Sequence, residues 1–98
     1  MYRKEYIPAQ PVDSNFRMAD LQGCWESLSG SPRLNVVRSG NGYRITYSYS
    51  TGVSITTRMF RYGGTVFFNL YGWIAIYYDP LRDVLTLSTE GNYYRAED

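Results

Sequence analysis

Turn-forming residues interrupt the chain at short intervals from Gly23 to its end. Glycine, asparagine, proline and aspartate gather in clusters such as SGNG, YGG and DPLRD, which separate runs rich in β-branched and aromatic residues. Such clusters favour tight turns, and such runs favour strands. The pattern predicts eight strands, over residues 24–29, 33–38, 43–50, 53–61, 65–70, 73–78, 84–88 and 93–95.

The connections between these runs contain only a few residues each. Connections that short make strands that are neighbours in sequence antiparallel neighbours in space. A flat meander of this kind would leave two edges open to aggregation, and closure into a barrel removes both edges. We therefore predict an all-β fold, a small antiparallel up-and-down barrel of about eight short strands.

The residues before the first strand do not follow this alternation. Residues 1–12 include two prolines and show no clear period, which predicts a flexible N-terminal arm. The polar residues Asp13–Asn15 can cap a helix that Gly23 would end. We therefore expect an arm over residues 1–12 and a single domain over residues 13–98 that opens with a helix of about two turns.

Composition limits the chemistry that the chain can perform. Of its 98 residues, 17% are aromatic, which favours sheet, and none is histidine. Histidine is the commonest general base near neutral pH and the commonest metal ligand. The single cysteine excludes an intramolecular disulfide. We expect a protein that is not an enzyme and that holds no metal or cofactor.

The stretch LQGC, which ends at Cys24, resembles the box that precedes a lipid-modified cysteine. Such a box follows an apolar segment, whereas the preceding DSNFRMAD is polar and acidic. Gln22 also stands where a small residue is required. No apolar run approaches the length of a membrane span. We interpret Cys24 as an ordinary strand residue and expect a cytoplasmic protein.

The two ends of the predicted barrel carry motifs that resemble known proteins. A short helix, then G-x-W at Gly23 and Trp25, then a meander with Arg95 near the last strand, resembles the lipocalin-type barrel. In that superfamily the tryptophan closes one end of the barrel and a late basic residue packs across its ring. The resemblance implies that Gly23, Trp25 and Arg95 form a structural barrel closure.

The chain is also similar to an uncharacterised family of chains of about this length from Bacteroides and its relatives. Members share GxW.S near the start and D.LTL…G.Y.R near the end, which appear here as GCWES and, over residues 83–95, as DVLTLSTEGNYYR. The resemblance covers about residues 20–95. It implies no activity, because the family has none assigned.

Strand length bears on whether the barrel can carry a ligand. Strands of five to seven residues span about 17–23 Å, and an eight-stranded barrel is just wide enough to be filled by its own side chains. The large side chains expected inside are those of Trp25, Trp73, Phe68, Leu70, Leu85 and Leu87. A packed interior is favoured, and carriage of a small apolar ligand remains an alternative.

The acidic residues near the end of the chain are candidates for metal ligands or paired catalytic carboxylates. Asp79 and Asp83 stand in DPLRD, and Glu90 stands in TEGN. Both stretches have the composition of turns, and neither has the alternating ligands of a calcium loop. We interpret all three residues as turn formers.

Positive charge is concentrated in the middle of the chain. No aspartate or glutamate occurs between Ser27 and Tyr78, whereas five arginines do. Alternation predicts that Arg44 and Arg58 point outward from neighbouring strands, with Phe60 beside Arg58. Arginines beside outward aromatics are typical of protein interfaces and of surfaces that stack nucleic-acid bases.

The predicted partner-binding face consists of Arg38, Arg44, Arg58, Phe60 and Arg61. We expect a non-catalytic binding or adaptor module that uses this face for a protein partner. The alternatives are a small apolar ligand inside the barrel, single-stranded nucleic acid on the outer face, or a merely solvated face. The oligomeric state is left open.

Overall fold

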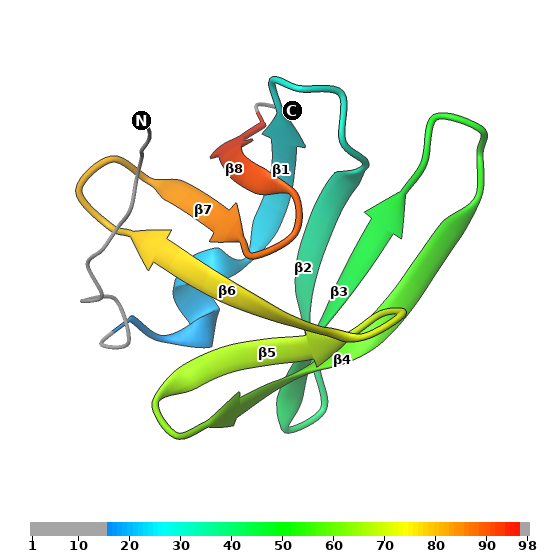
Figure 1. Cartoon of the computed structure of the whole chain (residues 1–98). Helices are drawn as coiled ribbons and strands as arrows, with labels where there is room; N and C mark the ends of the chain where they lie inside the picture. Colours follow the sequence, from blue (N-terminus) through cyan, green and yellow to red (C-terminus); the bar gives the residue numbers. More distant parts are fainter. Residues whose placement is uncertain (1–15, 97–98) are drawn as a thin grey trace.

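A computed structural model describes residues 16–96 of the chain. In this part, eight antiparallel strands close into a barrel in which each strand pairs with its neighbours in sequence and β8 returns to β1 (Figure 1). The all-β up-and-down barrel predicted from the sequence is confirmed. The strands are β1 (Gly23–Ser27), β2 (Arg33–Ser39), β3 (Gly42–Ser48), β4 (Ser54–Tyr62), β5 (Thr65–Asn69), β6 (Trp73–Asp79), β7 (Val84–Leu87) and β8 (Gly91–Arg95).

Tight turns make this closure possible, and the β4–β5 turn shows how. Tyr62 pairs with Thr65, so only Gly63 and Gly64 lie between the two strands. Both glycines have positive φ, 60° and 85°, as the two central residues of a type I′ hairpin turn require. Side chains other than glycine and asparagine disfavour that conformation, so the YGG signal sets the strand boundary.

The short helix before β1 is a single 3₁₀ turn, η3 (Met18–Leu21), rather than the two turns expected. Its first turn is closed by the Arg17 backbone N–H, which donates to Asp20 Oδ2 at 3.1 Å. A 3₁₀ turn rises about 2.0 Å per residue, against about 1.5 Å for an α-helix, so it crosses the end of the barrel in fewer residues. The expected cap at Asp13–Asn15 and the arm at residues 1–12 lie outside the described residues.

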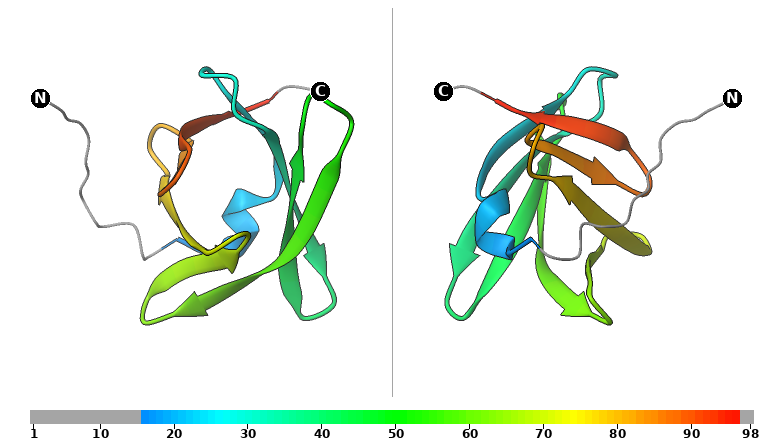
Figure 2. Two further views of the ribbon diagram at one scale, coloured as in Figure 1. Left: turned by 45° about the vertical axis from the view of Figure 1, so that its right-hand side comes forward. Right: turned by 90° about the vertical axis from the view of Figure 1, so that its left-hand side faces the viewer.

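Leu21 is fully buried, and η3 lies across one opening of the barrel (Figure 2). Phe16 leads into this turn and packs edge-to-face against Tyr78, with ring centroids 5.7 Å apart. The described residues include no helix that is long and apolar enough to cross a membrane.

The core is made by every second residue of the strands. The buried side chains form one cluster that includes Trp25, Leu34, Val36, Ile45, Tyr47, Met59, Val66, Phe68, Ile74, Ile76, Leu85, Leu87 and Tyr93. Leu70 packs against this cluster from a partly buried position. The expectation that Trp73 also lies inside is wrong, because Trp73 is 65% exposed. In β6 the inward positions belong to Ile74 and Ile76, and alternation turns Trp73 outward.

One end of the barrel is closed by Trp25 and Arg95, which lie directly opposite each other in β1 and β8. The Arg95 guanidinium carbon is 4.2 Å from the centroid of the Trp25 ring, a cation–π distance. Trp25 is fully buried, and its Nε1 donates to the Leu21 carbonyl at 2.8 Å. A Cβ on Gly23 would lie 2.9 Å from Arg95 Nη1, and the φ of Gly23 is 126°, so a side chain here would strain the backbone and displace the Arg95 guanidinium.

Candidate functional site

Two arginines face each other on the outer surface of the barrel. Arg44 in β3 lies directly opposite Arg58 in β4. Arg44 Nε donates to Ser39 Oγ at 3.1 Å, and Arg58 Nη2 lies 3.1 Å from the place where a Cβ on Gly42 would stand. Ser39 and Gly42 are themselves opposite each other in β2 and β3. Both side chains therefore reach the same cross-strand pair, and we call Arg44 and Arg58 the arginine pair.

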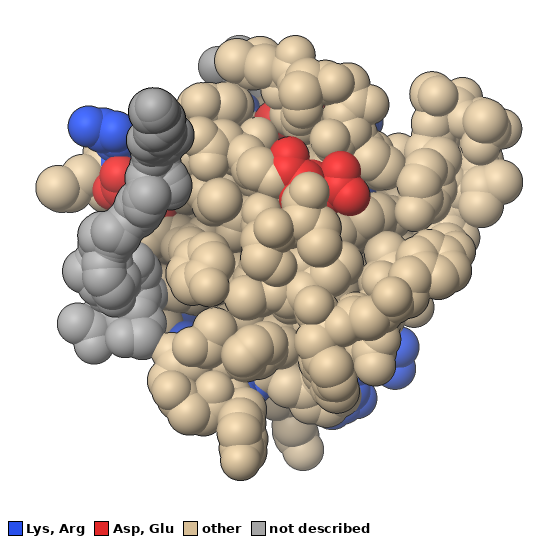
Figure 3. Space-filling view, viewed as in Figure 1, with Lys and Arg blue, Asp and Glu red and all other residues tan. Residues whose placement is uncertain are grey.

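Within residues 16–96, the arginine pair has no acidic partner. The ion pairs described within residues 16–96 join other arginines to Asp20, Glu26, Asp79 and Asp83. Like charges directly opposite each other in a sheet destabilise it. In the view of Figure 3, the lower half of the surface shows basic residues and no acidic ones, while the acidic residues lie in the upper half. The positive charge on this face is thus left without a counter-charge.

Beside the arginine pair, three aromatic rings meet on the outer surface of β4, β5 and β6. Phe60 lies opposite Phe67 in the sheet. The Trp73 ring meets the Phe60 ring at 69° with centroids 6.3 Å apart, and the Phe67 ring at 81° with centroids 6.4 Å apart. The rings therefore meet edge to face.

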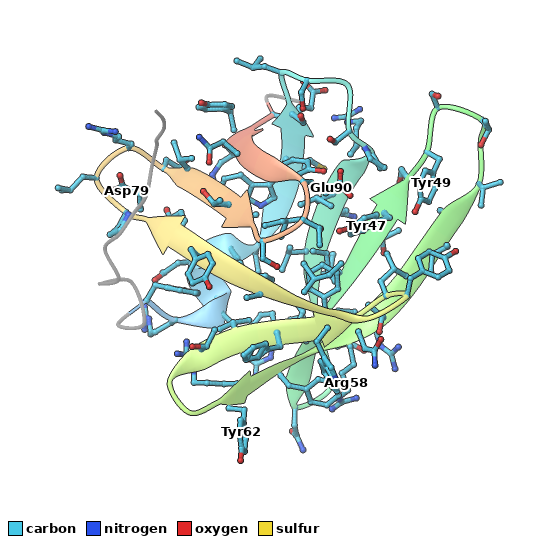
Figure 4. All side chains as sticks on the ribbon, viewed as in Figure 1. Tyr47, Tyr49, Arg58, Tyr62, Asp79 and Glu90 are labelled. Atoms are coloured by element: carbon cyan, nitrogen blue, oxygen red, sulfur yellow. The ribbon has the colours of Figure 1, made fainter. Side chains whose placement is uncertain are left out.

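These rings form the wall of a surface groove of about 650 Å³, lined by Phe60, Arg61, Tyr62, Phe67 and Trp73. We call it the aromatic groove. Tyr62 and Trp73 are 81% and 65% exposed. In Figure 4, Arg58 and Tyr62 lie on the same lower side of the barrel, along β4. Contiguous exposed apolar side chains are one feature that marks interaction sites on protein surfaces.

The structure brings together three of the five residues of the predicted face: Arg44, Arg58 and Phe60. Arg38 and Arg61 occupy inward-facing positions at the rim of the barrel, in line with Val36 in β2 and with Met59 in β4. Arg38 and Arg61 are nevertheless exposed, because β2 and β4 end at this rim.

Arg61 also has a structural role at this rim. Its Nη2 donates to the Phe16 carbonyl at 2.6 Å, and its guanidinium carbon lies 5.4 Å from the centroid of the Phe16 ring. Arg61 still borders the aromatic groove. Arg38 Nε reaches only the Gly40 carbonyl of its own turn, at 3.5 Å.

Sequence reasoning missed most of the aromatic groove. Tyr62 and Phe67 were not among the predicted site residues, and Trp73 was expected in the core. The signal was present in the sequence, because the apolar alternation of Ile74 and Ile76 fixes the inward face of that strand. The expectation that Trp73 lies inside did not follow this alternation.

The three candidate carboxylates lie at two connections of the barrel: Asp79 and Asp83 at the β6–β7 connection, and Glu90 at the β7–β8 connection. Asp79 Oδ1 accepts the backbone N–H groups of Leu81 and Arg82, as a turn former does. Asp83 lies in the same β6–β7 turn with a positive φ of 56° and also forms an ion pair with Arg95, and Glu90 lies in the turn before β8, at the far side of the barrel from Tyr62 (Figure 4). Residues 16–96 contain no cluster of three or more histidine, cysteine or acidic side chains that could hold a metal ion.

The hydrogen bonds from Arg95 Nε to Asp83 Oδ2 and from Arg95 Nη2 to Asp83 Oδ1 are 2.8 Å and 2.9 Å long. They hold the pKa of the Asp83 carboxyl below its usual range. Tyr78 also donates to Asp83 Oδ1, at 2.6 Å. These contacts engage both Asp83 carboxylate oxygens and bind the β6–β7 turn to the last strand.

Tyr47 and Tyr93 are buried inside the barrel, away from the outer face. Burial raises the pKa of Tyr93 to about 12 and that of Tyr47 further still. The Tyr93 hydroxyl donates to the Pro32 carbonyl at 2.9 Å. The Tyr47 hydroxyl is buried without a hydrogen-bond partner among the described residues. The Tyr93 hydroxyl therefore has a hydrogen-bond partner and the Tyr47 hydroxyl has none among the described residues, although both are core residues.

Comparison with known proteins places the chain in a family. Residues 11–95 match the family model described as "Domain of unknown function, B. Theta Gene description (DUF3876)". A search of curated proteins and a search of solved structures each found no match. The matched range includes every strand of the barrel, both residues of the Trp25–Arg95 closure and the whole outer face. The chain therefore belongs to the DUF3876 family, a family of domains of unknown function.

Proposed function

We propose that this protein is a non-catalytic binding module that holds a protein partner against the outer face of β3 to β6. The observation that carries the proposal is the edge-to-face cluster of Phe60, Phe67 and Trp73, in which Phe60 and Trp73 are exposed and Phe67 is half-buried. Tryptophan, tyrosine and arginine dominate the binding energy of protein interfaces, and all three residue types surround this groove. Burial of these rings against a partner removes apolar surface from water.

The chemistry of the face supports binding rather than catalysis. Its charged groups are arginines, which do not act as general bases near neutral pH. The chain contains no histidine that a substrate held here could use. The Asp83 carboxylate is ion-paired with Arg95.

The interior supports the outer face as the binding site over carriage of an apolar ligand in the barrel. The inward rings of Trp25, Phe68 and Tyr93 each have zero exposure and belong to one buried cluster. A ligand inside would have to displace these rings, and truncation or displacement of a large core side chain costs about 3–5 kcal/mol. The groove outside offers room without that cost.

Site-directed photo-crosslinking in the host cell tests this function. A benzophenone amino acid replaces Tyr62, which lines the groove and is 81% exposed, or Leu28, which is 86% exposed on the β1–β2 connection. We expect a discrete protein adduct at position 62, absent at position 28, that disappears when Trp73→Ala is added. Equal adducts at both positions, or an adduct that is insensitive to Trp73→Ala, contradict the proposal.

A further inference from the structure

We infer that the partner segment is acidic, with an apolar side chain that enters the aromatic groove and carboxylates that pair with Arg44 and Arg58. This inference rests on the proposed function and names the chemistry of the partner. It starts from the arginine pair, whose two guanidinium groups reach one cross-strand pair, Ser39 and Gly42, without an acidic neighbour.

Gly42 shows that this arrangement depends on packing. Gly42 is not among the residues with positive φ, so its backbone does not require glycine. A Cβ at this position would lie 3.1 Å from Arg58 Nη2 and 3.6 Å from Arg58 Cζ. The absence of a side chain therefore leaves the space in which the Arg58 guanidinium lies flat against β3.

An anion from a partner resolves the charge that the sheet leaves unbalanced. Within residues 16–96, neither Arg44 nor Arg58 forms an ion pair, and the two stand directly opposite each other. Arginine binds carboxylates through two parallel hydrogen bonds, which are stronger than neutral ones. Carboxylates placed over Ser39 and Gly42 would therefore convert a repulsive pair into a binding site.

The spacing between the arginine pair and the aromatic groove fits one short segment of a partner. Arg58 and Phe60 point from the same face of β4, two residues apart, which is about 7 Å along the strand. An extended partner segment with an acidic residue about two positions from a large apolar residue would contact both. The partner that fits is thus an acidic peptide segment with an apolar anchor.

A nucleic-acid partner fits the face less well. Its backbone would need cations along its path, but none of the outward residues of β5 and β6 is basic: they are Thr65, Phe67, Asn69, Trp73, Ala75, Tyr77 and Asp79. The rings meet edge to face at 69° and 81°, so they do not form a row of similarly oriented platforms for successive bases. A second copy that docked through the same face would bring one arginine pair against another.

Selection from a displayed library of random peptides tests the inference. Peptides are selected on the wild-type protein and then measured as synthetic peptides against variants. We expect the enriched peptides to carry aspartate or glutamate two or three positions from a tryptophan, phenylalanine, leucine or methionine. The double variant Arg44→Gln and Arg58→Gln should weaken their binding about tenfold or more.

Two further variants sharpen the result. Gly42→Ala should displace Arg58 and weaken the same peptides while leaving the circular dichroism of the folded barrel unchanged. Arg33→Gln is the matched control, because Arg33 is an outward arginine of β2 that is already paired with Glu26 at 3.2 Å. Its peptide affinity should equal that of the wild type.

The outcomes separate this inference from the proposed function. Enriched peptides that lack acidic residues, and that depend on Trp73 but not on the arginine pair, overturn the inference and leave the proposed function standing. If no selected peptide depends on Trp73, both are overturned. Binding of an oligothymidylate that is lost in the double arginine variant, or self-association that is lost in Trp73→Ala, also overturns the inference.

Discussion

Arg95 lies directly opposite Trp25 where the last strand closes the barrel on the first, with its guanidinium carbon 4.2 Å from the indole centroid. The same guanidinium donates to the carbonyls of Gln22 and Asp20 at 2.6 Å and 3.0 Å and forms an ion pair with Asp83. One side chain thus connects β8, η3, the start of β1 and the β6–β7 turn. The contacts of Arg95 therefore join β8 to β1 and also hold η3 across the end of the barrel.

Truncation of Trp25 should destabilise the barrel severely. Trp25 is fully buried, so Trp25→Ala removes a large core side chain and should lower the free energy of unfolding by about 3–5 kcal/mol. Urea denaturation followed by circular dichroism measures the loss. The matched control is Trp73→Ala, which should lower the free energy of unfolding by only about 0.5–1.5 kcal/mol, because Trp73 is mostly exposed and loses its edge-to-face ring contacts rather than core packing. Similar losses in both variants would show that Trp25 does not close the barrel.

The Asp83–Arg95 ion pair should make stability depend on pH in the acid range. The pKa of Asp83 is lower in the folded protein than its ordinary value of about 3.9 in the unfolded chain. The stabilisation is therefore complete above about pH 3.9 and is lost as the pH falls through the lower folded pKa.

The variant Asp83→Asn isolates this effect. At neutral pH it should unfold at a lower urea concentration than the wild type, and the difference should shrink progressively below about pH 3.9. Unfolding midpoints measured across the pH range give this curve. A difference that stays constant into strong acid would mean that the carboxylate charge of Asp83 does not stabilise the fold.

Tyr47 and Tyr93 should respond differently to loss of their hydroxyls. Tyr93→Phe removes the hydrogen bond to the Pro32 carbonyl and should lower the free energy of unfolding by about 0.5–1.5 kcal/mol. Tyr47→Phe removes a buried hydroxyl that has no partner among the described residues, so it should leave stability unchanged or raise it. Thermal denaturation compares the two variants. A loss for Tyr47→Phe as large as that for Tyr93→Phe would contradict this assignment.

The β5–β6 turn contains backbone strain that a substitution should relieve. Tyr71 has a φ of 62° and is 87% exposed, so its side chain gains little packing in return for a left-handed conformation. Asparagine adopts this conformation more readily. Tyr71→Asn should therefore raise the free energy of unfolding by about 0.5–1 kcal/mol. A lower melting temperature for the variant would show that the Tyr71 ring stabilises the turn.

The sequence predicted the fold well because its signals are local. Turn clusters mark the ends of the strands, and short connections leave antiparallel neighbours as the only arrangement. The alternation around Ile45 and Tyr47 gave the correct inward face of β3, since both are buried. The helix before β1 is shorter than predicted. Its length is set by the packing of Phe16 and Leu21 into the core, which a local sequence pattern does not reveal.

The candidate site was only partly predictable, for three physical reasons. Inward positions at the rim of a barrel are open to solvent, so Arg38 and Arg61 can occupy them without the burial of charge that marks the core. A large aromatic residue such as Trp73 is expected inside, yet the parity of its strand sets it outside. The aromatic groove also needs side chains from three strands, and their contact depends on register, which the sequence alone does not fix.

The most direct test of the central claim, that the outer face of β3 to β6 docks an acidic segment of a protein partner, is an NMR titration. Labelled protein is titrated with the tightest acidic peptide from the library selection, and backbone amide shifts are followed. We predict shifts at Arg44, Arg58, Phe60, Phe67 and Trp73, with none at Tyr47, Tyr49 and Glu90. Shifts confined to those last three residues, with the outer face unchanged, would contradict the claim.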